Sequence, residues 1–355
     1  MAALRVAVIG TGAFGRNHLR VYRELQSAHP ELVQLVALVD ADAQRRLEFS
    51  AQYSIPAFAS TDELHAAALG LDAASICVPT TQHAITAEAL LLAGVDVLIE
   101  KPFATTLAEA DHILALAAQH QRIVQIGHLE RFNPAVTATL AALNKPMFFE
   151  AHRLSIFTPR ALDVDVVLDL MIHDLDIVLA LTNSPVREVR AVGLPILSRK
   201  IDIANVRVEF ESGCVANFTA SRVSTEQVRK LRLFQPHQYL SLDFARQELL
   251  SIDVDPRLVA GLNAVADNPQ LAAQLFAHAA SSGSVDASHP TAGFSLTKAD
   301  IPKGEPLRLE LEDFLHAVRH RTAPRVTGLA GRAALALALQ INQHIAEHTQ
   351  RAGLA

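Results

Sequence analysis

Residues 10–15 read Gly10-Thr11-Gly12-Ala13-Phe14-Gly15, a glycine-rich turn with the spacing G-x-G-x-x-G. The apolar run Arg5–Ile9 before it predicts a buried strand, and Phe14–Ser27 after it has helical spacing. Between a strand and a helix, such glycines permit a tight turn, close approach of backbone to a pyrophosphate, and close packing of the helix on the strand. Free N–H groups at the start of the helix would bind phosphates. We therefore expect residues 10–15 to hold a dinucleotide.

An acidic residue follows the next apolar run, Val33–Val39. Asp40 stands where the second strand of a dinucleotide-binding fold ends, and a carboxylate there can hydrogen-bond the ribose hydroxyls of the adenosine. The same charge would repel a 2′-phosphate. Asp40 therefore favours NAD over NADP as the cofactor, although Arg45 and Arg46 nearby could weaken that preference.

Apolar runs continue to alternate with helical patterns up to about residue 127. Ala73–Val78, Val95–Ile99 and Ile123–Ile126 predict buried strands, while His83–Ala93 and Leu107–Gln119 have helical spacing. Continuous apolar strands alternating with helices are typical of a parallel sheet that is covered on both faces. We therefore predict an α/β protein whose residues 1–127 form an N-terminal Rossmann domain.

The pattern changes in the remaining residues, 128–355. Val206, Val208 and Phe210 alternate with polar residues, residues 211–213 offer a turn, and Cys214–Ala220 alternates again, which predicts a hairpin with one buried face. Further strands are expected at Phe148–Leu154, Leu231–Phe234 and Tyr239–Phe244, helices at Val164–Leu181, Leu309–His320 and Arg332–Thr349, and a helix with a loop at 256–303. We predict an α+β domain on an open, mostly antiparallel sheet, with the C-terminal helices packing back toward the Rossmann domain.

The composition argues against several classes of protein. Half of the 355 residues are hydrophobic, as in a folded globular protein, and the formal net charge of −6 gives no general attraction to nucleic acid or to an anionic membrane. No apolar run reaches the roughly 18 residues of a membrane span. Cys77 and Cys214 lie in apolar patterns and are expected to be free thiols in a reducing compartment. Because no signal peptide is recognisable, we expect a cytoplasmic protein.

Glu100-Lys101-Pro102 follows the apolar run Val95–Ile99, after the glycine turn and the motif Pro79-Thr80-Thr81-Gln82-His83. These motifs in this order resemble the Gfo/Idh/MocA oxidoreductases, the family of glucose–fructose oxidoreductase, inositol dehydrogenase and rhizopine catabolism proteins. The resemblance extends over nearly the whole chain. It implies a catalytic role for Lys101 and a cis peptide bond at Lys101–Pro102. Cofactor contacts are expected from Pro79, Thr80, His83, Glu100 and Lys101, with a capping role also open for His83.

The family's Asp-x-x-x-His motif corresponds to Asp169-Leu170-Met171-Ile172-His173. Residues four apart lie on one face of a helix, so Asp169 and His173 can point at one spot. A dehydrogenase must remove the hydroxyl proton as hydride leaves the carbon, and histidine suits that task near neutral pH. Lys101 can hydrogen-bond the developing alkoxide, while Asp169 can orient the imidazole or contact a substrate hydroxyl. We therefore expect Lys101, His173 and Asp169 to be catalytic.

Each of these residues has a simpler interpretation on its own. Lys101 could be a solvated lysine at a strand end. Asp169 and His173 could be a pair on a helix surface, since the chain has sixteen histidines. Asp174 and Asp176 are close enough in sequence to be confused with Asp169. No HExxH-type face and no third ligand accompany them, and hydride transfer to NAD needs no metal, so no metal site is expected.

The run Gly127-His128-Leu129-Glu130-Arg131-Phe132-Asn133-Pro134 resembles the branch of the family that oxidises the 3-hydroxyl of UDP-N-acetylhexosamines. This implies a 3-keto sugar nucleotide, made above all from UDP-N-acetylglucosamine, for an aminotransferase step toward the diamino sugars of lipid A or O-antigen. Arginines can bind a diphosphate bidentately, although each could also be an ordinary surface residue. The expected substrate contacts are Lys101, His128, Arg131, Asn133, Arg153, Arg160, Asp169 and His173.

Other functions stay open at this point. The chain could be an NAD-dependent dehydrogenase of a free polyol or sugar such as myo-inositol, or a non-catalytic sensor that binds NAD. We also expect a homodimer or homotetramer formed through the C-terminal sheet, because an uncovered apolar sheet face demands a partner.

Overall fold

The computed structural model describes residues 2–157, 164–264, 268–271, 273–274 and 294–353. The chain forms two compact units, and neither is continuous in sequence. The first unit comprises residues 1–133, 167–180 and 304–343, and the second comprises residues 134–166, 181–303 and 344–355. The domain bounds 1–127 and 128–355 stay a prediction from the sequence.

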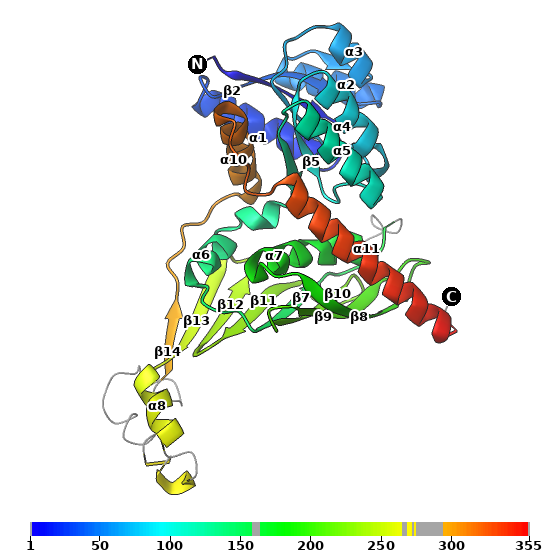
Figure 1. The fold of residues 1–355 in the computed structure, drawn as a ribbon. Helices are drawn as coiled ribbons and strands as arrows, with labels where there is room; N and C mark the ends of the chain where they lie inside the picture. Colours follow the sequence, from blue (N-terminus) through cyan, green and yellow to red (C-terminus); the bar gives the residue numbers. More distant parts are fainter. Residues whose placement is uncertain (1, 158–163, 265–267, 272, 275–293, 354–355) are drawn as a thin grey trace. The chain divides into compact units, whose positions relative to one another are not determined.

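A six-stranded parallel sheet forms the centre of the first unit (Figure 1). Its strand order, β3-β2-β1-β4-β5-β6, is that of a Rossmann fold, and the order reverses between β1 and β4. The strands are β1 (Leu4–Ile9), β2 (Val33–Val39), β3 (Ala57–Phe58), β4 (Ala73–Ile76), β5 (Asp96–Glu100) and β6 (Val124–Gly127). The predicted parallel sheet is confirmed, and only the short strand β3 was not expected.

Helices cover both faces of this sheet, because successive residues of a strand point to opposite sides. Val6 and Val8 of β1 belong to one core, together with α1 (Gly15–Ala28) and α10 (Pro306–His320). Ala7 and Ile9 belong to the other core, with α4 (His83–Leu92), α5 (Leu107–Gln119) and part of α11 (Gly328–Arg351). The unit also contains α2 (Ala43–Tyr53), α3 (Thr61–Ala66), the 3₁₀ turns η1 (Thr80–Gln82) and η2 (Leu129–Phe132), the π-helical turn η4 (Val167–Met171) and most of α7 (Ile172–Thr182).

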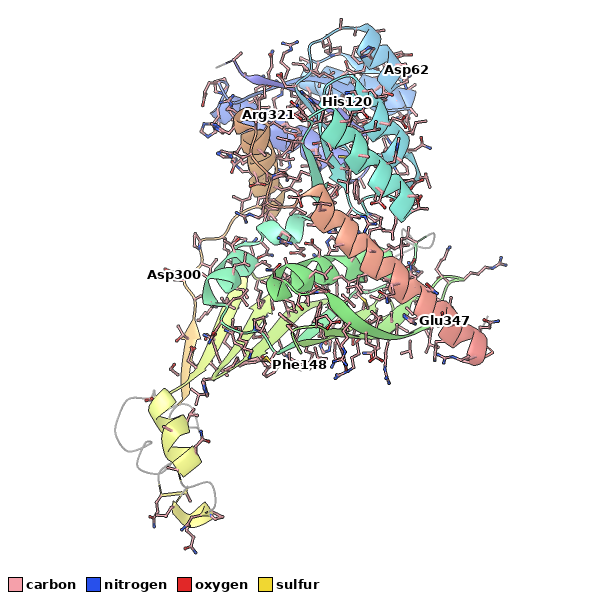
Figure 2. The ribbon with its side chains drawn as sticks, viewed as in Figure 1. Asp62, His120, Phe148, Asp300, Arg321 and Glu347 are labelled. Atoms are coloured by element: carbon pink, nitrogen blue, oxygen red, sulfur yellow. The ribbon has the colours of Figure 1, made fainter. Side chains whose placement is uncertain are left out.

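Two arginines attach the end of α10 to the sheet of the first unit. Arg321, labelled in Figure 2, places its Nη1 atom 2.5 Å from Oδ2 of the buried Asp96 at the start of β5. Arg319 donates from Nη2 to the carbonyl oxygen of Leu32 at 2.8 Å. Although α10 lies far along the chain from β5, it is therefore part of the Rossmann core.

The second unit is built on an eight-stranded sheet with the order β14-β13-β12-β11-β7-β10-β9-β8. All neighbouring strands are antiparallel except β7 and β10, which confirms the prediction of a mostly antiparallel sheet. The strands are β7 (Phe148–Leu154), β8 (Val186–Leu194), β9 (Ile203–Phe210), β10 (Val215–Ser221), β11 (Val228–Gln235), β12 (Gln238–Asp243), β13 (Glu248–Val254) and β14 (Phe294–Lys298), and the helices are α6 (Pro134–Ala142) and α8 (Pro256–Ala264). The predicted hairpin is β9–β10, and its turn holds Gly213 at φ +82°.

Several elements differ from the expectation. The helix predicted at Val164–Leu181 begins with the π-helical turn η4 and continues as α7. In the segment 256–303, where a helix with a loop was expected, α8 accounts for the helix, but Phe294–Lys298 forms the edge strand β14 on β13. The remainder of 265–293 lies largely outside the described residues.

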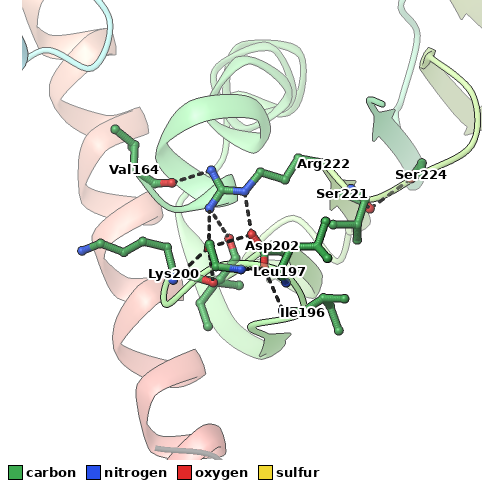
Figure 3. Close-up of polar contacts among 11 residues, drawn as sticks. Val164, Ile196, Leu197, Lys200, Asp202, Ser221, Arg222 and Ser224 are labelled. Carbon is green, nitrogen blue, oxygen red and sulfur yellow. Dashed lines mark hydrogen bonds and ion pairs between the residues drawn. The ribbon is translucent and has the colours of Figure 1, made fainter. Parts of the chain in front are cut away.

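A buried ion pair ties together three segments of the second unit (Figure 3). Asp202 at the start of β9 and Arg222 after β10 are both buried, with Arg222 Nε 2.8 Å from Asp202 Oδ1. The other oxygen of Asp202 accepts hydrogen bonds from the amides of residues 196–198 at 2.6–2.9 Å. Arg222 also donates to the carbonyl oxygen of Val164 at 2.7 Å. Burial alone would raise the pKa of Asp202, but the three amides outweigh it and hold that pKa well below its ordinary value.

Cys77 and Cys214 are both free, as predicted, and burial raises the pKa of each thiol. In the described part of the chain, no helix combines the length and the hydropathy that a bilayer crossing requires.

Candidate functional site

The glycine turn between β1 and α1 has the geometry that its spacing predicts. Gly10 has φ +87°, and a Cβ atom there would lie 2.8 Å from the backbone after β4. A Cβ atom on Gly15 would lie 1.8 Å from the carbonyl oxygen of Gly10, so only glycine fits both positions. Gly12, in contrast, faces open space, with only Arg45 within 4 Å. The start of α1 has no side-chain cap, although the amides of Arg16 and Asn17 donate to the carbonyl oxygens of Gly12 and Phe14.

A cavity of about 880 Å³ lies beside this turn, at the carboxyl ends of β1, β2 and β4, where the strand order reverses. It lies wholly within the first unit. Its lining includes Gly10, Gly12, Ala13, Asp40 and Pro79, all of which the sequence predicted to bind the cofactor. Sequence reasoning missed Gln82, Ile85 and Thr86, which line it from η1 and α4. The open space over Gly12, the uncapped helix and this cavity together fit a bound dinucleotide.

Asp40 is held in place by the turn itself. Its Oδ2 accepts hydrogen bonds from the amide and the hydroxyl of Thr11, both at 2.7 Å, and its Oδ1 accepts one from the Asp42 amide at 2.9 Å. Arg45 lies 3.8 Å away. Burial alone would raise the pKa of Asp40, but these hydrogen bonds outweigh it and lower that pKa below its ordinary value. The group is therefore a carboxylate at neutral pH, and Oδ1 still has a lone pair for a ligand hydroxyl.

Lys101 follows β5, and its peptide bond to Pro102 is cis, as the resemblance implied. The lysine Nζ donates to the backbone carbonyl oxygen of Asp169 at 2.7 Å and lies 3.6 Å from the Asp169 carboxylate. Both side chains are partly exposed. The structure thus brings Lys101 and Asp169 together. The carbonyl contact comes from the π-helical turn η4, and no sequence pattern predicted it, because backbone oxygens carry no residue signature.

His173 and His128 approach each other from different elements. His173 lies on α7 and is half-buried, and His128 stands between β6 and η2 and is buried. Their ring centroids are 6.5 Å apart with the ring planes nearly perpendicular. Burial lowers the pKa of His128. Arg131 of η2 places Nη1 3.4 Å from the buried Asp176 of α7.

Some residues predicted to touch ligands are instead directed at the protein. Both ring nitrogens of the buried His83 face backbone carbonyl oxygens, namely those of Val78, Pro102 and Phe103. Burial lowers the pKa of His83, in keeping with a neutral structural ring. Asn133 is buried and donates to the Glu130 carboxylate at 3.1 Å. Phe14 contacts the ring of His18 edge-on at 5.6 Å, and Thr80 begins η1.

Glu100 is turned inward as well. Its Oε1 lies 2.9 Å from Nε2 of the fully buried His18 on α1, and its carboxylate rests against Gly127, where a Cβ atom would approach it to 2.9 Å. Among the described residues, His18, Cys77 and Glu100 form the one group of possible metal ligands that lie within 4.8 Å of one another. Sequence reasoning missed His18, although a histidine one turn after the glycine motif on an apolar helix face was a visible signal.

Arg153 and Arg160 are the two remaining arginines that were expected at the substrate. Arg153 of β7 is in the second unit, where its guanidinium is buried 5.3 Å from the centre of the Phe244 ring. Arg160 lies outside the described residues.

Comparisons with known proteins identify the family. Residues 4–128 match the model of an oxidoreductase family with an NAD-binding Rossmann fold, and residues 136–235 match the GFO/IDH/MocA C-terminal domain. The chain is 35% identical over 352 residues to UDP-N-acetylglucosamine 3-dehydrogenase of Acidithiobacillus ferrooxidans, covering 99% of this chain and 100% of the relative. A solved structure of that enzyme has a TM-score of 0.83 and covers 97% of this chain and 98% of its own.

More distant proteins share less. An inositol 2-dehydrogenase of Acidiphilium cryptum is 31% identical over 180 residues, which is 49% of this chain and 53% of the relative. The aldose–aldose oxidoreductase of Caulobacter crescentus, at 19% identity and a TM-score of 0.76 over 98% of both chains, shares the fold. From the paired domain matches and the relative that spans its length, the chain belongs to the GFO/IDH/MocA oxidoreductases, a family with an NAD-binding Rossmann fold.

Proposed function

We propose that this protein oxidises the 3-hydroxyl of UDP-N-acetylglucosamine to the 3-keto sugar nucleotide with NAD as the hydride acceptor. The relative with that name is similar over the whole chain, whereas the inositol dehydrogenase aligns with about half of it. The product would be the substrate for amination toward the diamino sugars of lipid A or O-antigen. The observation that carries the proposal is the Lys101 ammonium held at Asp169, in the unit that also contains His173 and the glycine turn.

NAD rather than NADP is proposed as the cofactor because of Asp40. Its carboxylate is ionised and fixed by Thr11, so it offers an acceptor to a ribose hydroxyl and repels a 2′-phosphate. Arg45 is drawn toward Asp40 and Asp42, which reduces its availability to a phosphate. Bound NAD would accept the hydride from the sugar carbon.

The protein's own residues accept the hydroxyl proton and stabilise the negative charge that develops on the oxygen. His173 takes the hydroxyl proton, a task that suits the imidazole of histidine. Lys101 donates a hydrogen bond to the oxygen as negative charge develops on it. Asp169 fixes the lysine through its carbonyl oxygen and its carboxylate. Arg131 of the same unit is proposed to contact the nucleotide, in keeping with the preference of diphosphates for arginine.

A substrate panel tests this function. Purified protein with NAD is mixed with UDP-N-acetylglucosamine, UDP-N-acetylgalactosamine or myo-inositol, with and without 2-oxoglutarate, while NADH absorbance is followed and products are analysed by mass spectrometry. We expect the 3-keto product from the UDP-N-acetylhexosamine. Product that forms only with 2-oxoglutarate would indicate that NAD is recycled in place. Oxidation of myo-inositol alone would replace the proposal with a polyol dehydrogenase, and binding of NAD with no turnover of any substrate would favour a sensor.

Substitution of the lysine is the sharper test. Lys101→Ala removes the donor to the developing alkoxide, so kcat should fall by about a hundredfold or more, while NAD binding stays within about twofold. The binding can be measured by quenching of NADH fluorescence. His112→Ala is a matched control, because His112 lies on the exposed face of α5 and pairs with Glu88. Turnover that survives in Lys101→Ala would contradict the assignment.

We also propose a homodimer or homotetramer formed through the sheet of the second unit. Phe148, Phe234 and Tyr239 form an aromatic row there, with ring centroids 5.6 and 4.9 Å apart, and Phe234 is 39% exposed (Figure 2 labels Phe148). Light scattering of the wild type and of Phe234→Asp would show whether this face associates.

A further inference from the structure

His128 and Asp176 are buried in a way that hydrogen bonding within the described chain does not explain. His128 is 1% exposed and Asp176 is 2% exposed. Neither ring nitrogen of His128 has a partner among the described residues, and neither does Oδ2 of Asp176. A buried polar group without a partner is destabilising, so two such side chains at one place point to a function.

Both side chains belong to the neighbourhood of His173. His173 and Asp176 are three residues apart on α7, so they lie on one face of that helix. His128 approaches from the end of β6, with its ring edge-on to the ring of His173 at 6.5 Å between centroids. The two rings are therefore close neighbours. His128 is thus beside the proposed base and closed off from solvent.

The charges around His128 suit a group that accepts a proton for a short time. Burial disfavours its charged form, and the ammonium of Lys101 and the guanidinium of Arg131 act in the same direction. Asp176 and Glu100 act in the opposite direction and stabilise an imidazolium. Arg131 anchors one oxygen of Asp176 at 3.4 Å and leaves Oδ2 without a partner among the described residues. The ring would therefore be neutral at rest, with a carboxylate nearby to stabilise a positive charge.

We propose that His128 is a proton-holding residue that acts through His173, with Asp176 stabilising its charged form. This inference rests on the proposed function. As hydride leaves the sugar carbon, the hydroxyl O–H bond breaks and His173 becomes an imidazolium. His173 then gives that proton to the neutral ring of His128, which becomes the imidazolium while His173 is neutral again. When the product leaves, the proton returns through His173 to solvent, so charge and protons balance over the cycle.

Kinetics of two substitutions separate proton acceptance from packing. His128→Phe keeps a ring of similar shape and His128→Gln keeps polarity, but neither can accept a proton. We expect kcat for UDP-N-acetylglucosamine oxidation to fall between about tenfold and about a hundredfold in both, with KM values within about twofold. The remaining rate should increase with the concentration of imidazole buffer, whereas the wild-type rate should not. His112→Phe is the matched control and should behave as the wild type.

The same kinetics can also contradict the proposal. If His128→Phe retains the wild-type kcat and its independence of buffer, the ring serves packing alone and the proposal is overturned. Thermal unfolding and NADH binding of each variant show whether a loss of activity reflects a loss of fold. Should the phenylalanine variant not fold, the glutamine variant carries the same comparison.

A second measurement does not depend on turnover. Imidazole NMR signals of the wild type in complex with NAD are followed against pH, and the His128 signal is assigned by its absence in His128→Gln. We expect a neutral ring at neutral pH whose titration midpoint falls further in Asp176→Asn, because the stabilising carboxylate is lost. A midpoint that does not respond to Asp176→Asn overturns the inference. If UDP-N-acetylglucosamine is not a substrate at all, the NMR titration still shows whether Asp176 stabilises the charged form of His128. The two proposals can therefore fail separately.

Discussion

Glu310 lies on the buried face of α10, in the same stripe as Leu307, Leu311 and Phe314. It is fully buried, and neither carboxylate oxygen has a hydrogen-bond partner among the described residues. Burial raises the pKa of Glu310 well above its ordinary value, and the nearby charges of Glu100, Asp313 and Asp176 raise it further. An acid in an apolar stripe is visible in the sequence, but its neighbours Glu100 of β5 and Asp176 of α7 come from two other segments and are not.

This residue should make stability depend on pH. The unfolded chain releases the Glu310 proton near pH 4.5, whereas the folded chain retains it, so the free energy of unfolding falls as pH rises above that value. Glu310→Gln mimics the protonated acid and removes the dependence. We expect the free energy of unfolding of Glu310→Gln to increase relative to that of the wild type, by up to about 1.4 kcal/mol for each pH unit above pH 4.5. Urea unfolding between about pH 5 and about pH 8 measures this.

Glu312→Gln is the control for that series, since Glu312 is on the same helix but is partly exposed and paired with Arg308 at 3.0 Å. Its effect should be small at every pH. A constant difference between Glu310→Gln and the wild type across the range would mean that Glu310 is ionised in the folded protein, against the assignment.

Among the elements of the second unit, the loop between β8 and β9 is organised by one carboxylate. Asp202 accepts hydrogen bonds from three successive amides and pairs with the buried Arg222. Removing one partner of a buried ion pair leaves an uncompensated charge, which costs about 3–5 kcal/mol. The loop conformation therefore depends on a residue whose role is invisible until β9 and β10 are paired.

Asp202→Asn should lower the free energy of unfolding by about 3 kcal/mol at neutral pH. Because the pKa of Asp202 is depressed in the folded state, the wild-type advantage is present above pH 3.8, the ordinary value, and is lost as pH falls below it. Denaturant titrations at several pH values check both parts. Glu209→Gln breaks an exposed pair with Arg207 on the same sheet and should cost at most about 1 kcal/mol. Equal losses in the two variants would refute the argument.

Strands were predictable where their burial was strong. The strands of the parallel sheet read as continuous apolar runs because both of their faces are covered, and β9–β10 alternates because one face is buried. The edge strand β8 was missed, because Val192 and Leu194 are exposed and only Val189 and Gly193 of Val186–Leu194 are buried, so no period of two is visible.

The candidate site was also predictable only in part. Residue types in a motif, such as the glycines, Asp40 and Lys101, can be named from the sequence, and the structure lines the cavity with several of them. Contacts made by backbone could not be foreseen, and the Asp169 carbonyl oxygen on Lys101 is the clearest case. The inward turn of Glu100 toward His18 was equally hidden, since it joins residues 82 positions apart. The roles of these side chains stay predictions until the variants are measured.

At the scale of the whole molecule, the first unit is completed by α10, which begins at Pro306, whereas the last strand of the unit ends at Gly127. Leu307, Leu311 and Phe314 of α10 pack with α1, β1 and β2 in one buried core. The helix that opens at the glycine turn is therefore supported by the far end of the chain. Residues 1–133 alone would expose this apolar face and lose part of their core.

Phe314→Ala in the full chain tests this dependence. Phe314 is fully buried, so its truncation should cost about 3–5 kcal/mol, whereas Phe234→Ala on the partly exposed sheet surface should cost far less. Since NAD is proposed to bind the same unit, NAD at about a hundred times its Kd should restore about 2.7 kcal/mol of the loss. Calorimetry with and without NAD measures both effects. If Phe314→Ala unfolds at the wild-type temperature, or if NAD stabilises the wild type but not the variant, then α10 is not part of the cofactor-binding fold in the way its packing requires.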